Sequence, residues 1–342
     1  MRICALVWAL LAASAACAAE SPSWATKDLR AGIIGTDNGH AVAFSGAFKG
    51  HPEWRIKTVV AYKGGSPDMP FSADRIEGIS AKVRENGVEF VDSIEELLKR
   101  VDVVHLHSVD GRPHLAQATP VFKAGKRLFI DKPLAATVAD AHAIMELSKQ
   151  TGTPYFSSST MRFRGNLAQL RDNPGVGKVL KVQMPRGGPG LMNGAYGIHE
   201  NEMLFTVMGT GCISVTKTEE GYVGKWKDGR LGIVGATKMG DKAPRIQVVG
   251  TDGKADYVDS GGVYDALIRA TAEFFHTGKP PVEPEVAVEI IEFMVAAQFS
   301  RERSGAEVTL EEVRKPPAST YAEPIRIRGK SATKTSPAGS KE

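Results

Sequence analysis

The stretch Leu29-Arg-Ala-Gly-Ile-Ile-Gly35-Thr-Asp-Asn-Gly-His40 decides how this 342-residue chain folds. Its first part is apolar and β-rich, a glycine loop follows, and the residues after it have helical spacing. Five further strand-like runs follow, each separated from the next by a helical pattern. This alternation predicts an α/β fold, a Rossmann-like doubly wound parallel sheet over residues 29–159. The strands are expected at Leu29–Gly35, Ile56–Tyr62, Val88–Val91, Val101–His107, Arg127–Ile130 and Pro154–Ser157.

The helices of this region are expected at Ala41–Lys49, Ala73–Glu85, Ser93–Lys99, Pro113–Lys123 and Val138–Gln150. After residue 159 the pattern changes. A helix at Phe163–Arg171 and a strand at Lys178–Met184 lead into short runs with the tight-turn pairs Asp228-Gly229 and Asp252-Gly253. Two long helices follow. We therefore predict a second, α+β domain with a mostly antiparallel open sheet over residues 160–312.

The N-terminal segment 1–19, MRICALVWALLAASAACAA, has the layout of a secretory signal peptide, with one arginine, a short apolar stretch and then small residues. The apolar stretch is too short to span a membrane. We expect export to the periplasm or the outside of the cell. Lipid attachment at Cys17 is the less favoured alternative. Cleavage leaves Cys212 as the one remaining cysteine, so no internal disulfide is expected.

The formal net charge of +4 is unevenly distributed. Residues 313–342 form a segment rich in Pro, Ser, Thr and Lys with a net charge of +5, which predicts a flexible basic tail. Residues 20–312 carry a net charge of −2. The body therefore has no basic stripe for nucleic acid. The hydrophobic content of the whole chain, 42%, excludes a disordered protein.

The loop after the first strand departs from a dinucleotide-binding fingerprint, G-x-G-x-x-G. Counted from Gly35, Asp37 takes the place of the second glycine and His40 that of the third. Asp37 either places a carboxylate where a diphosphate would lie or caps the next helix while Asn38-Gly39 makes the turn. After the second strand, Lys63 and Ser66 suit a 2′-phosphate, a slight preference for NADP over NAD; the alternative for Lys63 is simple exposure to solvent.

Three motifs point to a known family. They are Phe129-Ile-Asp131-Lys132-Pro133, Arg112-Pro-His114 and Gly197-Ile-His199. With the order of elements, they resemble the Gfo/Idh/MocA oxidoreductases, named after glucose–fructose oxidoreductase and inositol dehydrogenase. The resemblance covers about residues 29–312. It implies a nucleotide domain ending in a Glu-Lys-Pro motif, here with Asp131 for the glutamate, and a C-terminal α+β domain with a large open sheet.

Lys132 follows a central strand at the edge where doubly wound sheets bind ligands. An ammonium group there can polarise a hydroxyl or carbonyl group or move a proton; the alternative is a structural ion pair. The resemblance implies that Lys132 lies near nicotinamide and substrate, and that His199 is a second catalytic residue. Members of the family often have an aspartate where this chain has Ala195. The alternative for His199 is a local hydrogen bond that caps a helix.

His105 and His107 alternate along the fourth strand and should face one side, where core packing is favoured over a place in the groove. His199 and Glu202 are too few to form a metal site, and no metal is predicted. For Arg162 and Arg164, surface salt bridges are the alternative to substrate contact. The expected cofactor contacts are Gly35, Thr36, Asp37, Asn38, His40, Lys63, Ser108, Pro113, His114, Asp131 and Lys132, and the expected substrate contacts are Arg162, Arg164, Tyr196 and His199.

The resemblance thus implies an NAD(P)-dependent oxidoreductase that transfers a hydride from a sugar, polyol or related carbohydrate. Two alternatives remain open: a cofactor-free carbohydrate-binding protein of the same fold, and a glycoside hydrolase or lyase that recycles a tightly bound NAD. An open antiparallel sheet often packs against another subunit, so a homo-oligomer is also expected.

Overall fold

The computed structural model describes residues 20–184, 197–235, 246–259, 261 and 264–315. The N-terminal half is a six-stranded parallel sheet in the order β3-β2-β1-β4-β5-β6, which confirms the doubly wound fold. The strands are β1 (Leu29–Ile34), β2 (Ile56–Tyr62), β3 (Glu89–Val91), β4 (Val103–Leu106), β5 (Arg127–Asp131) and β6 (Tyr155–Ser158). The connecting helices are α1 (Gly39–Gly50), α2 (Pro70–Ala73), α3 (Ile76–Glu85), α4 (Ile94–Arg100), α5 (His114–Lys123) and α6 (Val138–Thr151).

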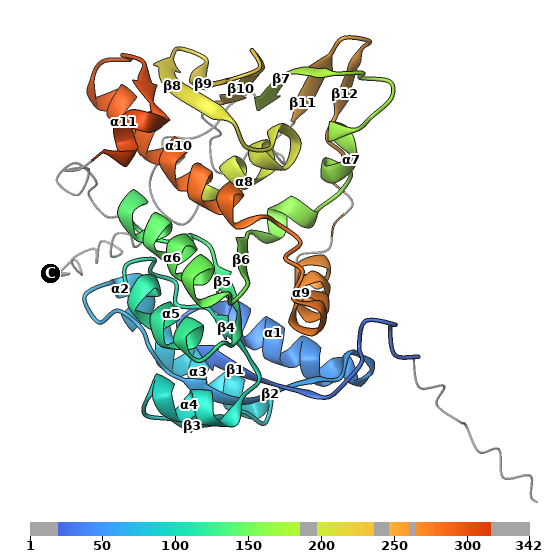
Figure 1. Ribbon diagram of the computed structural model, residues 1–342, viewed down its shortest axis with the longest axis vertical. Coiled ribbons are helices and arrows are strands. Elements are labelled where there is room, and N and C mark those ends of the chain that lie inside the picture. Colours follow the sequence, from blue (N-terminus) through green and yellow to red (C-terminus); the bar gives the residue numbers. More distant parts are fainter. Residues whose placement is uncertain (1–19, 185–196, 236–245, 260, 262–263, 316–342) are drawn as a thin grey trace, which may run out of the picture.

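Side chains alternate between the two faces of this sheet along each strand. Both faces are buried, because each packs into a hydrophobic cluster. Val104 and Leu106 of β4 pack into the large core that also contains residues of α4, α5 and α6. Val103, one position before Val104, belongs to a second cluster with Phe44 and Phe48 of α1. The helices at the two faces of the sheet can be followed in Figure 1.

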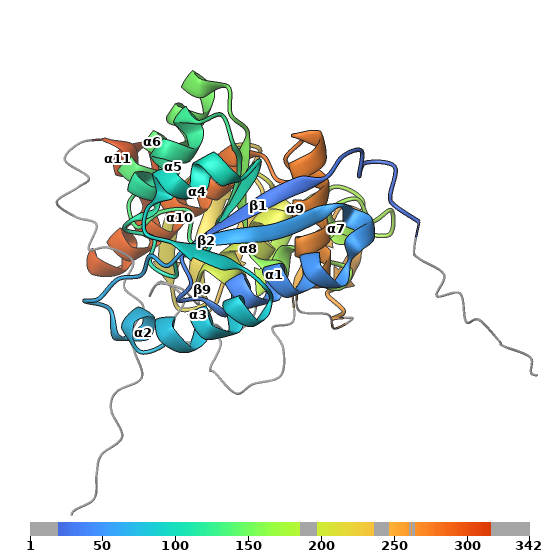
Figure 2. The same cartoon turned by 90° about the horizontal axis from the view of Figure 1, so that it is seen from below.

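The second half of the chain supplies a helix to the first. Helix α9 (Asp265–Thr277) lies beside α1 in both views (Figures 1 and 2) and buries Leu267, Ile268 and Phe275 in the same cluster as Phe44. Arg127 of β5 donates to the carbonyl oxygen of Phe275 at 2.6 Å. One face of the Rossmann sheet is therefore partly covered by a helix that lies more than a hundred residues further along the chain.

The C-terminal half contains a seven-stranded sheet in the order β12-β11-β7-β10-β9-β8-β13, in which β10 and β7 are parallel and the other pairs antiparallel. Helices α8 and α10 pack against it (Figure 1). The elements are α7 (Leu167–Arg171), β7 (Val179–Met184), α8 (Gly197–Met208), β8 (Cys212–Thr218), β9 (Gly221–Trp226), β10 (Leu231–Val234), β11 (Gln247–Gly250), β12 (Lys254–Asp256), α10 (Pro284–Glu302), β13 (Val308–Thr309) and α11 (Leu310–Arg314).

Two predicted helices are each divided in the structure. The segment 73–85 contains the end of α2 and all of α3, separated by a turn at Asp74 and Arg75. The segment 163–171 contains the end of a 3-10 turn (Thr160–Phe163) and α7. Gly165 separates these two because its φ is +55° and a Cβ there would lie 2.1 Å from the carbonyl oxygen of Val258.

The predicted tail begins too early in the sequence. Val313 is fully buried in α11, and Arg314 binds the buried Glu292 of α10 through two hydrogen bonds of 2.6 Å. Glu292 also contacts His142 of α6 at 2.6 Å. Residues 313–315 therefore belong to the folded domain. Segments 1–19 and 316–342 lie outside the described residues. Within the part of the chain that the structure describes, no helix is long and apolar enough to cross a membrane.

Candidate functional site at the carboxyl edge of the parallel sheet

The loop between β1 and α1 lies directly against the loop that follows β4. Gly35 has a φ of +87°, and a Cβ on it would lie 2.3 Å from the backbone nitrogen of Ser108. A side chain there would collide with backbone, so the fold requires glycine. Beside it, Thr36 is buried and hydrogen-bonds Ser80 of α3 at 2.7 Å. The loop is therefore fixed by its neighbours on both sides.

Asp37 neither caps α1 nor reaches solvent. Asn38 is the capping residue, and its side chain accepts from the backbone N–H of His40 at 3.2 Å. The Asp37 carboxylate is fully buried; it accepts from the backbone N–H of Val109 at 3.0 Å and from the hydroxyl of Ser72 at 2.5 Å. Burial raises the pKa of Asp37, and these hydrogen bonds oppose the rise. The proposed capping role of Asp37 is thus wrong, and the residue ties three loops together.

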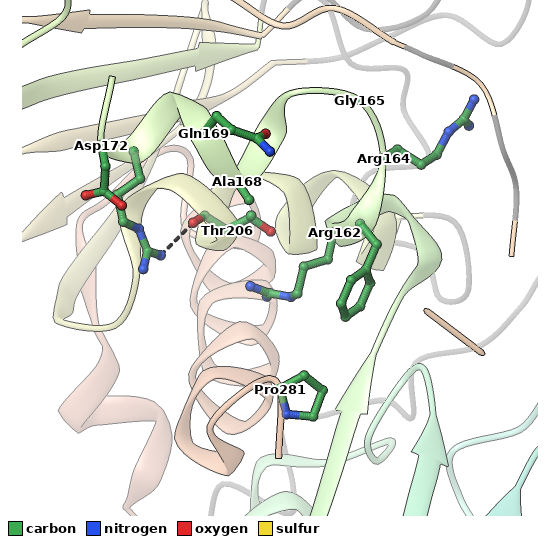
Figure 3. Close-up of a pocket in the computed structure, with 10 residues that line it drawn as sticks. Arg162, Arg164, Gly165, Ala168, Gln169, Asp172, Thr206 and Pro281 are labelled. Carbon is green, nitrogen blue, oxygen red and sulfur yellow. Dashed lines mark hydrogen bonds between the residues drawn. The ribbon is translucent and has the colours of Figure 1, made fainter. Parts of the chain in front are cut away.

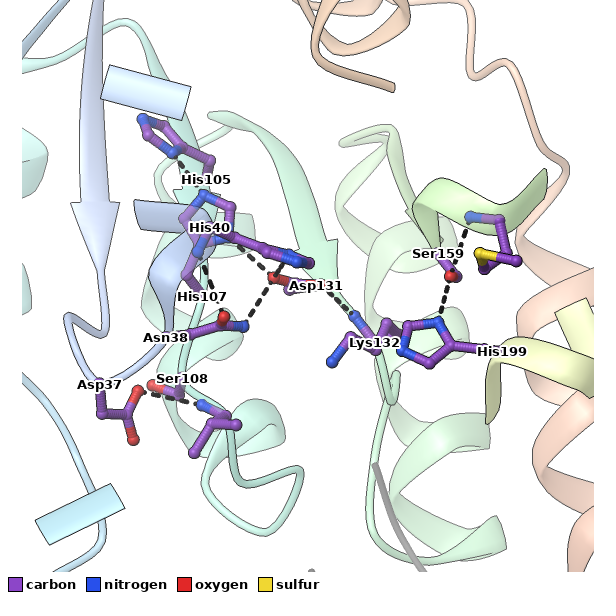
Figure 4. A network of polar contacts seen from close by, with 12 residues as sticks. Asp37, Asn38, His40, His105, His107, Ser108, Asp131, Lys132, Ser159 and His199 are labelled. Atoms are coloured by element: carbon purple, nitrogen blue, oxygen red, sulfur yellow. Dashed lines mark hydrogen bonds and ion pairs between the residues drawn. The ribbon is translucent and has the colours of Figure 1, made fainter. Parts of the chain in front are cut away.

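A histidine–aspartate cluster lies at the ends of β4 and β5 (Figure 4). The Oδ2 atom of Asp131 lies 2.6 Å from Nδ1 of His40 and 3.1 Å from Nδ1 of His107. Asn38 donates to the same oxygen at 3.0 Å. Behind His107, Nδ1 of His105 lies 2.8 Å from its Nε2 atom. His105 and His107 do share one face, and both rings pack in the core against Phe44, as expected, while they also form a buried polar network.

The electrostatics of the cluster follow from its burial. Burial lowers the pKa of His105 well below its ordinary value and also lowers that of His107, for which the bond to Asp131 opposes the change. Burial pushes the pKa of Asp131 upward, but electrostatic interaction with His40, hydrogen bonds with His107 and His40, and the charge of Lys132 outweigh it and hold that pKa well below its usual range. Asp131 is therefore a carboxylate at neutral pH.

Lys132 and His199 lie next to each other beside this cluster (Figure 4). The backbone N–H of Lys132 donates to Oδ1 of Asp131 at 2.8 Å, and the side chain is largely buried. His199, from the first turn of α8, places Nδ1 2.5 Å from the hydroxyl of Ser159. Burial, and next the charge of Lys132, lower the pKa of His199 to about 3. The two predicted catalytic residues therefore come together, with His199 uncharged.

Other predicted cofactor contacts are held by neighbouring groups. Lys63 forms an ion pair with Glu77 of α3, and Ser66 donates to the buried Asp110 at 2.6 Å. The hydroxyl of Ser108 donates to Gln117 at 2.8 Å. The first two contacts use the side chains of Lys63 and Ser66, on which the 2′-phosphate interpretation depends.

The Arg112-Pro-His114 motif connects the loop after β4 to the loop after β5. Pro113 is the residue before the first turn of α5. The ring of His114 is fully buried, with Nε2 2.8 Å from the carbonyl oxygen of Ser108 and Nδ1 3.1 Å from that of Leu134. In this structure His114 therefore fixes the spacing of the two loops that flank the cluster.

Arg162 and Arg164 are engaged in ion pairs. Arg162 binds the buried Glu202 of α8 at 2.7 Å, and Arg164 binds Asp259 at 2.7 Å. Figure 3 shows the two side chains extending in opposite directions at a pocket of about 430 Å³ whose lining includes neither Lys132 nor His199. Tyr196, the remaining predicted substrate contact, lies outside the described residues.

Comparison with known proteins identifies the N-terminal half. Residues 29–158 match the model of an oxidoreductase family described as having an NAD-binding Rossmann fold, Gfo/Idh/MocA. The similarity to the Gfo/Idh/MocA family is thus found over residues 29–158, which are less than half of the chain. The match covers the sheet described above, with Asp131 and Lys132 at the end of β5, and it agrees with the resemblance seen in the sequence motifs.

One curated relative of the Gfo/Idh/MocA domain is the 1,5-anhydro-D-fructose reductase of Ensifer adhaerens. It is 29% identical over 129 residues, which are 37% of this chain and 38% of the reductase. The matched part thus spans well under half of that relative.

Solved structures match over both halves of the chain. A "probable dehydrogenase" from Thermotoga maritima covers 83% of this chain and all of its own, with a TM-score of 0.67 and 21% identity. A scyllo-inositol dehydrogenase from Lactobacillus casei covers 83% of this chain and 99% of its own, with a TM-score of 0.63 and 16% identity. At these identities the likeness establishes the fold of both domains.

Sequence reasoning did not bring His40, His107 and Asp131 together. The three come from α1, the segment directly after β4, and the end of β5, and no spacing along the chain links them. Two signals were present in the sequence. His40 stands in place of a loop glycine, and two histidines, at positions 105 and 107, share one strand face. Because β1, β4 and β5 are neighbours in the sheet, those signals meet at one edge.

Proposed function

We propose that this protein is an NAD(P)-dependent oxidoreductase acting on a sugar, polyol or related carbohydrate. The observation that carries the proposal is the convergence of Lys132 and His199 at the carboxyl edge of the parallel sheet of an NAD-binding family. Ligands of doubly wound sheets bind at that edge. A partly buried ammonium group and an uncharged imidazole suit a hydroxyl-bearing substrate better than an anionic or apolar one.

The first loop supplies the backbone features that a dinucleotide needs. Gly35 lets the chain turn at a positive φ, and α1 begins four residues later with its N-terminus at this loop. A helix N-terminus attracts phosphate through its backbone N–H groups. The buried Asp37 carboxylate is committed to Val109 and Ser72 rather than to the first turn of α1. The backbone N–H groups of Gly35, Thr36 and His40 are bonded within the protein. The dinucleotide would therefore be held by the backbone of Asn38 and Gly39 at the start of α1, and its nicotinamide would supply the hydride acceptor.

Lys132 is the residue we assign to the substrate hydroxyl. Its backbone is fixed by Asp131, so the side chain starts from a defined position at the sheet edge. When the carbonyl compound is reduced, the ammonium group of Lys132 polarises the carbonyl oxygen and donates a proton to it as the hydride arrives. In the reverse oxidation, the uncharged amine of Lys132 accepts the hydroxyl proton as the hydride leaves the carbinol carbon, and the proton then passes to water. His199, with its pKa of about 3, is too weak a base to take that proton at neutral pH. We assign His199 the role of a hydrogen-bonding partner that orients the substrate.

The test begins with the purified protein, without assuming a substrate. It is denatured and the released nucleotide is identified by mass spectrometry, and in parallel the melting temperature is measured with NAD(H) or NADP(H). Released nucleotide or a thermal shift is expected. The absence of both signals would refute the proposal.

Turnover on a panel of sugars and polyols then tests Lys132. We expect Lys132→Ala to keep nucleotide binding but to lose turnover. Lys123→Ala is the matched control, because Lys123 is an exposed lysine at the end of α5. Unchanged turnover in Lys132→Ala would contradict the assignment.

The choice between NAD and NADP is a separate part of the proposal. The preference for NADP rests on Lys63, which is paired with Glu77 on α3. A 2′-phosphate has to displace this carboxylate, whereas a ribose hydroxyl can donate to it. Titration of the wild type and of Glu77→Gln with both nucleotides decides: a 2′-phosphate site predicts that Glu77→Gln binds NADP more tightly and NAD no better.

A second candidate function is favoured by one observation. Asp37 bridges the loop after β4 and α2 as a buried carboxylate next to the dinucleotide loop. If this bridge closes the nucleotide groove, the protein is a cofactor-free carbohydrate-binding member of the fold. The expected results are then no nucleotide, no nucleotide-induced thermal shift and retained sugar binding by calorimetry. A recycled NAD in a hydrolase or lyase would instead give bound nucleotide without net reduction.

We further propose export and self-association. Export rests on the signal-peptide pattern in residues 1–19, and sequencing the N-terminus of the mature protein tests it. Self-association is supported by Leu180 on β7 and Ile213 on β8, each 50% exposed on strands of the second sheet. Sedimentation of the wild type and of Leu180→Glu tests it; a monomer in both would refute it.

A further inference from the structure

The buried cluster at the end of β4 and β5 has a donor set that a hydrogen-bonded network alone does not explain. Three nitrogen atoms, from His40, His107 and Asn38, all lie within 3.1 Å of the single atom Oδ2 of Asp131. A carboxylate oxygen offers about two lone pairs. Three potential donors therefore compete for two acceptor positions in a place that water hardly reaches, since His107 and Asp131 are fully buried.

We propose that His40, His107 and Asp131 form a binding site for one divalent transition-metal ion such as Zn²⁺. Each residue offers one ligand atom, and the three atoms lie within 4.8 Å of one another. Two imidazoles and a carboxylate are a common ligand set for zinc and for non-haem iron. Three protein ligands also leave a coordination position for water or substrate.

The ligand atoms lie near the spacing that a single ion needs. Zinc lies about 2.0–2.2 Å from such ligands, which places the ligand atoms roughly 3.3 Å apart around a tetrahedral ion. The present separations from Oδ2 of Asp131 are 2.6 Å to His40 and 3.1 Å to His107. These two separations would open by roughly 0.7 Å and 0.2 Å. The third, between the two Nδ1 atoms, is at most 4.8 Å and would close by up to roughly 1.5 Å through side-chain rotation. With the two histidine nitrogens bound to the ion, Asn38 can keep its hydrogen bond to Oδ2 of Asp131. That oxygen then accepts from one donor instead of three.

The residues behind the ligands also suit a metal. Metal-bound histidines usually use their second ring nitrogen in a hydrogen bond that fixes the ring. Nε2 of His107 has such a partner in Nδ1 of His105, whose Nε2 in turn lies 3.4 Å from the hydroxyl of Thr58. When a metal takes the place of the proton on Nδ1 of His107, Nε2–H of His107 can donate to His105 and Nε2–H of His105 to Thr58. The chain of hydrogen bonds stays intact with every imidazole neutral.

The position of the site gives the ion a functional place. Asp131 directly precedes Lys132, and the charges of Lys132, His40 and Asp131 all act on His199. An ion held here would lie at the same sheet edge as the residues assigned to the substrate. The proposal goes beyond the oxidoreductase function and does not depend on bound nucleotide.

The experiment uses the full-length protein treated with a chelator and then dialysed. Zn²⁺ is titrated by calorimetry, and Co²⁺ by its visible absorption, with Mg²⁺ as the hard-ion control. We expect one Zn²⁺ per chain, Co²⁺ bands that Zn²⁺ abolishes, and no response to Mg²⁺. Absence of saturable Zn²⁺ binding in the wild type would overturn the proposal.

Variants connect the binding to these residues. His40→Gln and Asp131→Asn should each weaken Zn²⁺ binding at least as much as loss of a supporting residue does, which is typically about 10–100-fold. His105→Phe, which fits the aromatic surroundings of that ring, should weaken it by about 10–100-fold. His51→Ala is the matched control, since His51 is an exposed histidine. Circular dichroism identifies any variant that fails to fold.

Zn²⁺ binding that survives both His40→Gln and Asp131→Asn would place the metal elsewhere and overturn the proposal. Nucleotide release, measured on the same samples, reports on the oxidoreductase proposal separately. Zinc binding with neither released nucleotide nor a nucleotide-induced thermal shift would support the metal site and refute the redox function. Nucleotide binding without zinc binding would support the redox function and refute the metal site.

Discussion

His199 should make the folded protein lose stability as the pH falls from 7 to 5. Its imidazole is uncharged in the native state because burial, and then the charge of Lys132, lower its pKa to about 3 from an ordinary 6.5. In the unfolded chain the same ring binds a proton as soon as the pH drops below 6.5. The unfolded state therefore holds more protons than the native state between these two values, and unfolding becomes easier with every step toward acid.

The size of the effect follows from the two pKa values. Each pH unit below 6.5 contributes about 1.4 kcal/mol, so the loss between pH 7 and pH 5 is at most about 2 kcal/mol. The ring keeps some solvent contact, so we expect about 1–2 kcal/mol. Below pH 3 the native state is protonated as well, and the loss levels off.

Urea unfolding at pH 5, 6 and 7, followed by tryptophan fluorescence and far-UV circular dichroism, measures the effect. His199→Asn keeps a polar group that can bond to Ser159 but does not titrate, so it should lose about 1–2 kcal/mol less than the wild type between pH 7 and pH 5. His51→Asn, a change at an exposed histidine, is the control and should behave as the wild type does. Equal pH dependence in His199→Asn and the wild type would refute the reasoning.

Two further predictions concern stability. Gly35→Ala places a Cβ 2.3 Å from the backbone of Ser108 at a φ of +87°. Because the left-handed conformation alone costs about 1–2 kcal/mol, calorimetry should show a melting temperature lower by roughly 2–8 °C. An unchanged melting temperature would contradict the close approach. Glu292→Gln weakens the bonds from α10 to Arg314 and His142. Because both partners are partly exposed, we expect the free energy of unfolding in urea at pH 7 to fall by about 1–3 kcal/mol. If Glu292→Gln costs as much in a protein that already carries Arg314→Ala and His142→Ala, these bonds are not the source of the loss.

The first domain was predictable to a large extent because its signals are local. Each of its six strands is a short apolar run between helical patterns, and the structure places a strand in every one. The start of α4 is local in the same way, since the hydroxyl of Ser93 accepts from the backbone N–H of Glu96 three residues on. Such features need only neighbouring residues, so the sequence contains all the information about them.

The second domain was predicted less well because its elements depend on partners. Gly165 divides a helical pattern because the chain passes close to the backbone of Val258, almost a hundred residues away. The three-residue strand β12 and the two-residue strand β13 exist through pairing with β11 and β8. α11 is held by Glu292 of α10, so no local pattern distinguishes it from the basic segment that follows.

The candidate site likewise has some features that the sequence determines and others that only the tertiary structure decides. The sequence by itself determined the doubly wound sheet, the place of Lys132 at the end of a central strand, and the departure of Asp37 and His40 from a glycine fingerprint. The tertiary structure alone decided that Asp37 bridges two other loops and that His40, His107 and Asp131 share one buried point. The reason is that strand and helix signals repeat within a few residues, whereas neighbours across a parallel sheet are set by strand order, which joins residues about 25 to 90 positions apart.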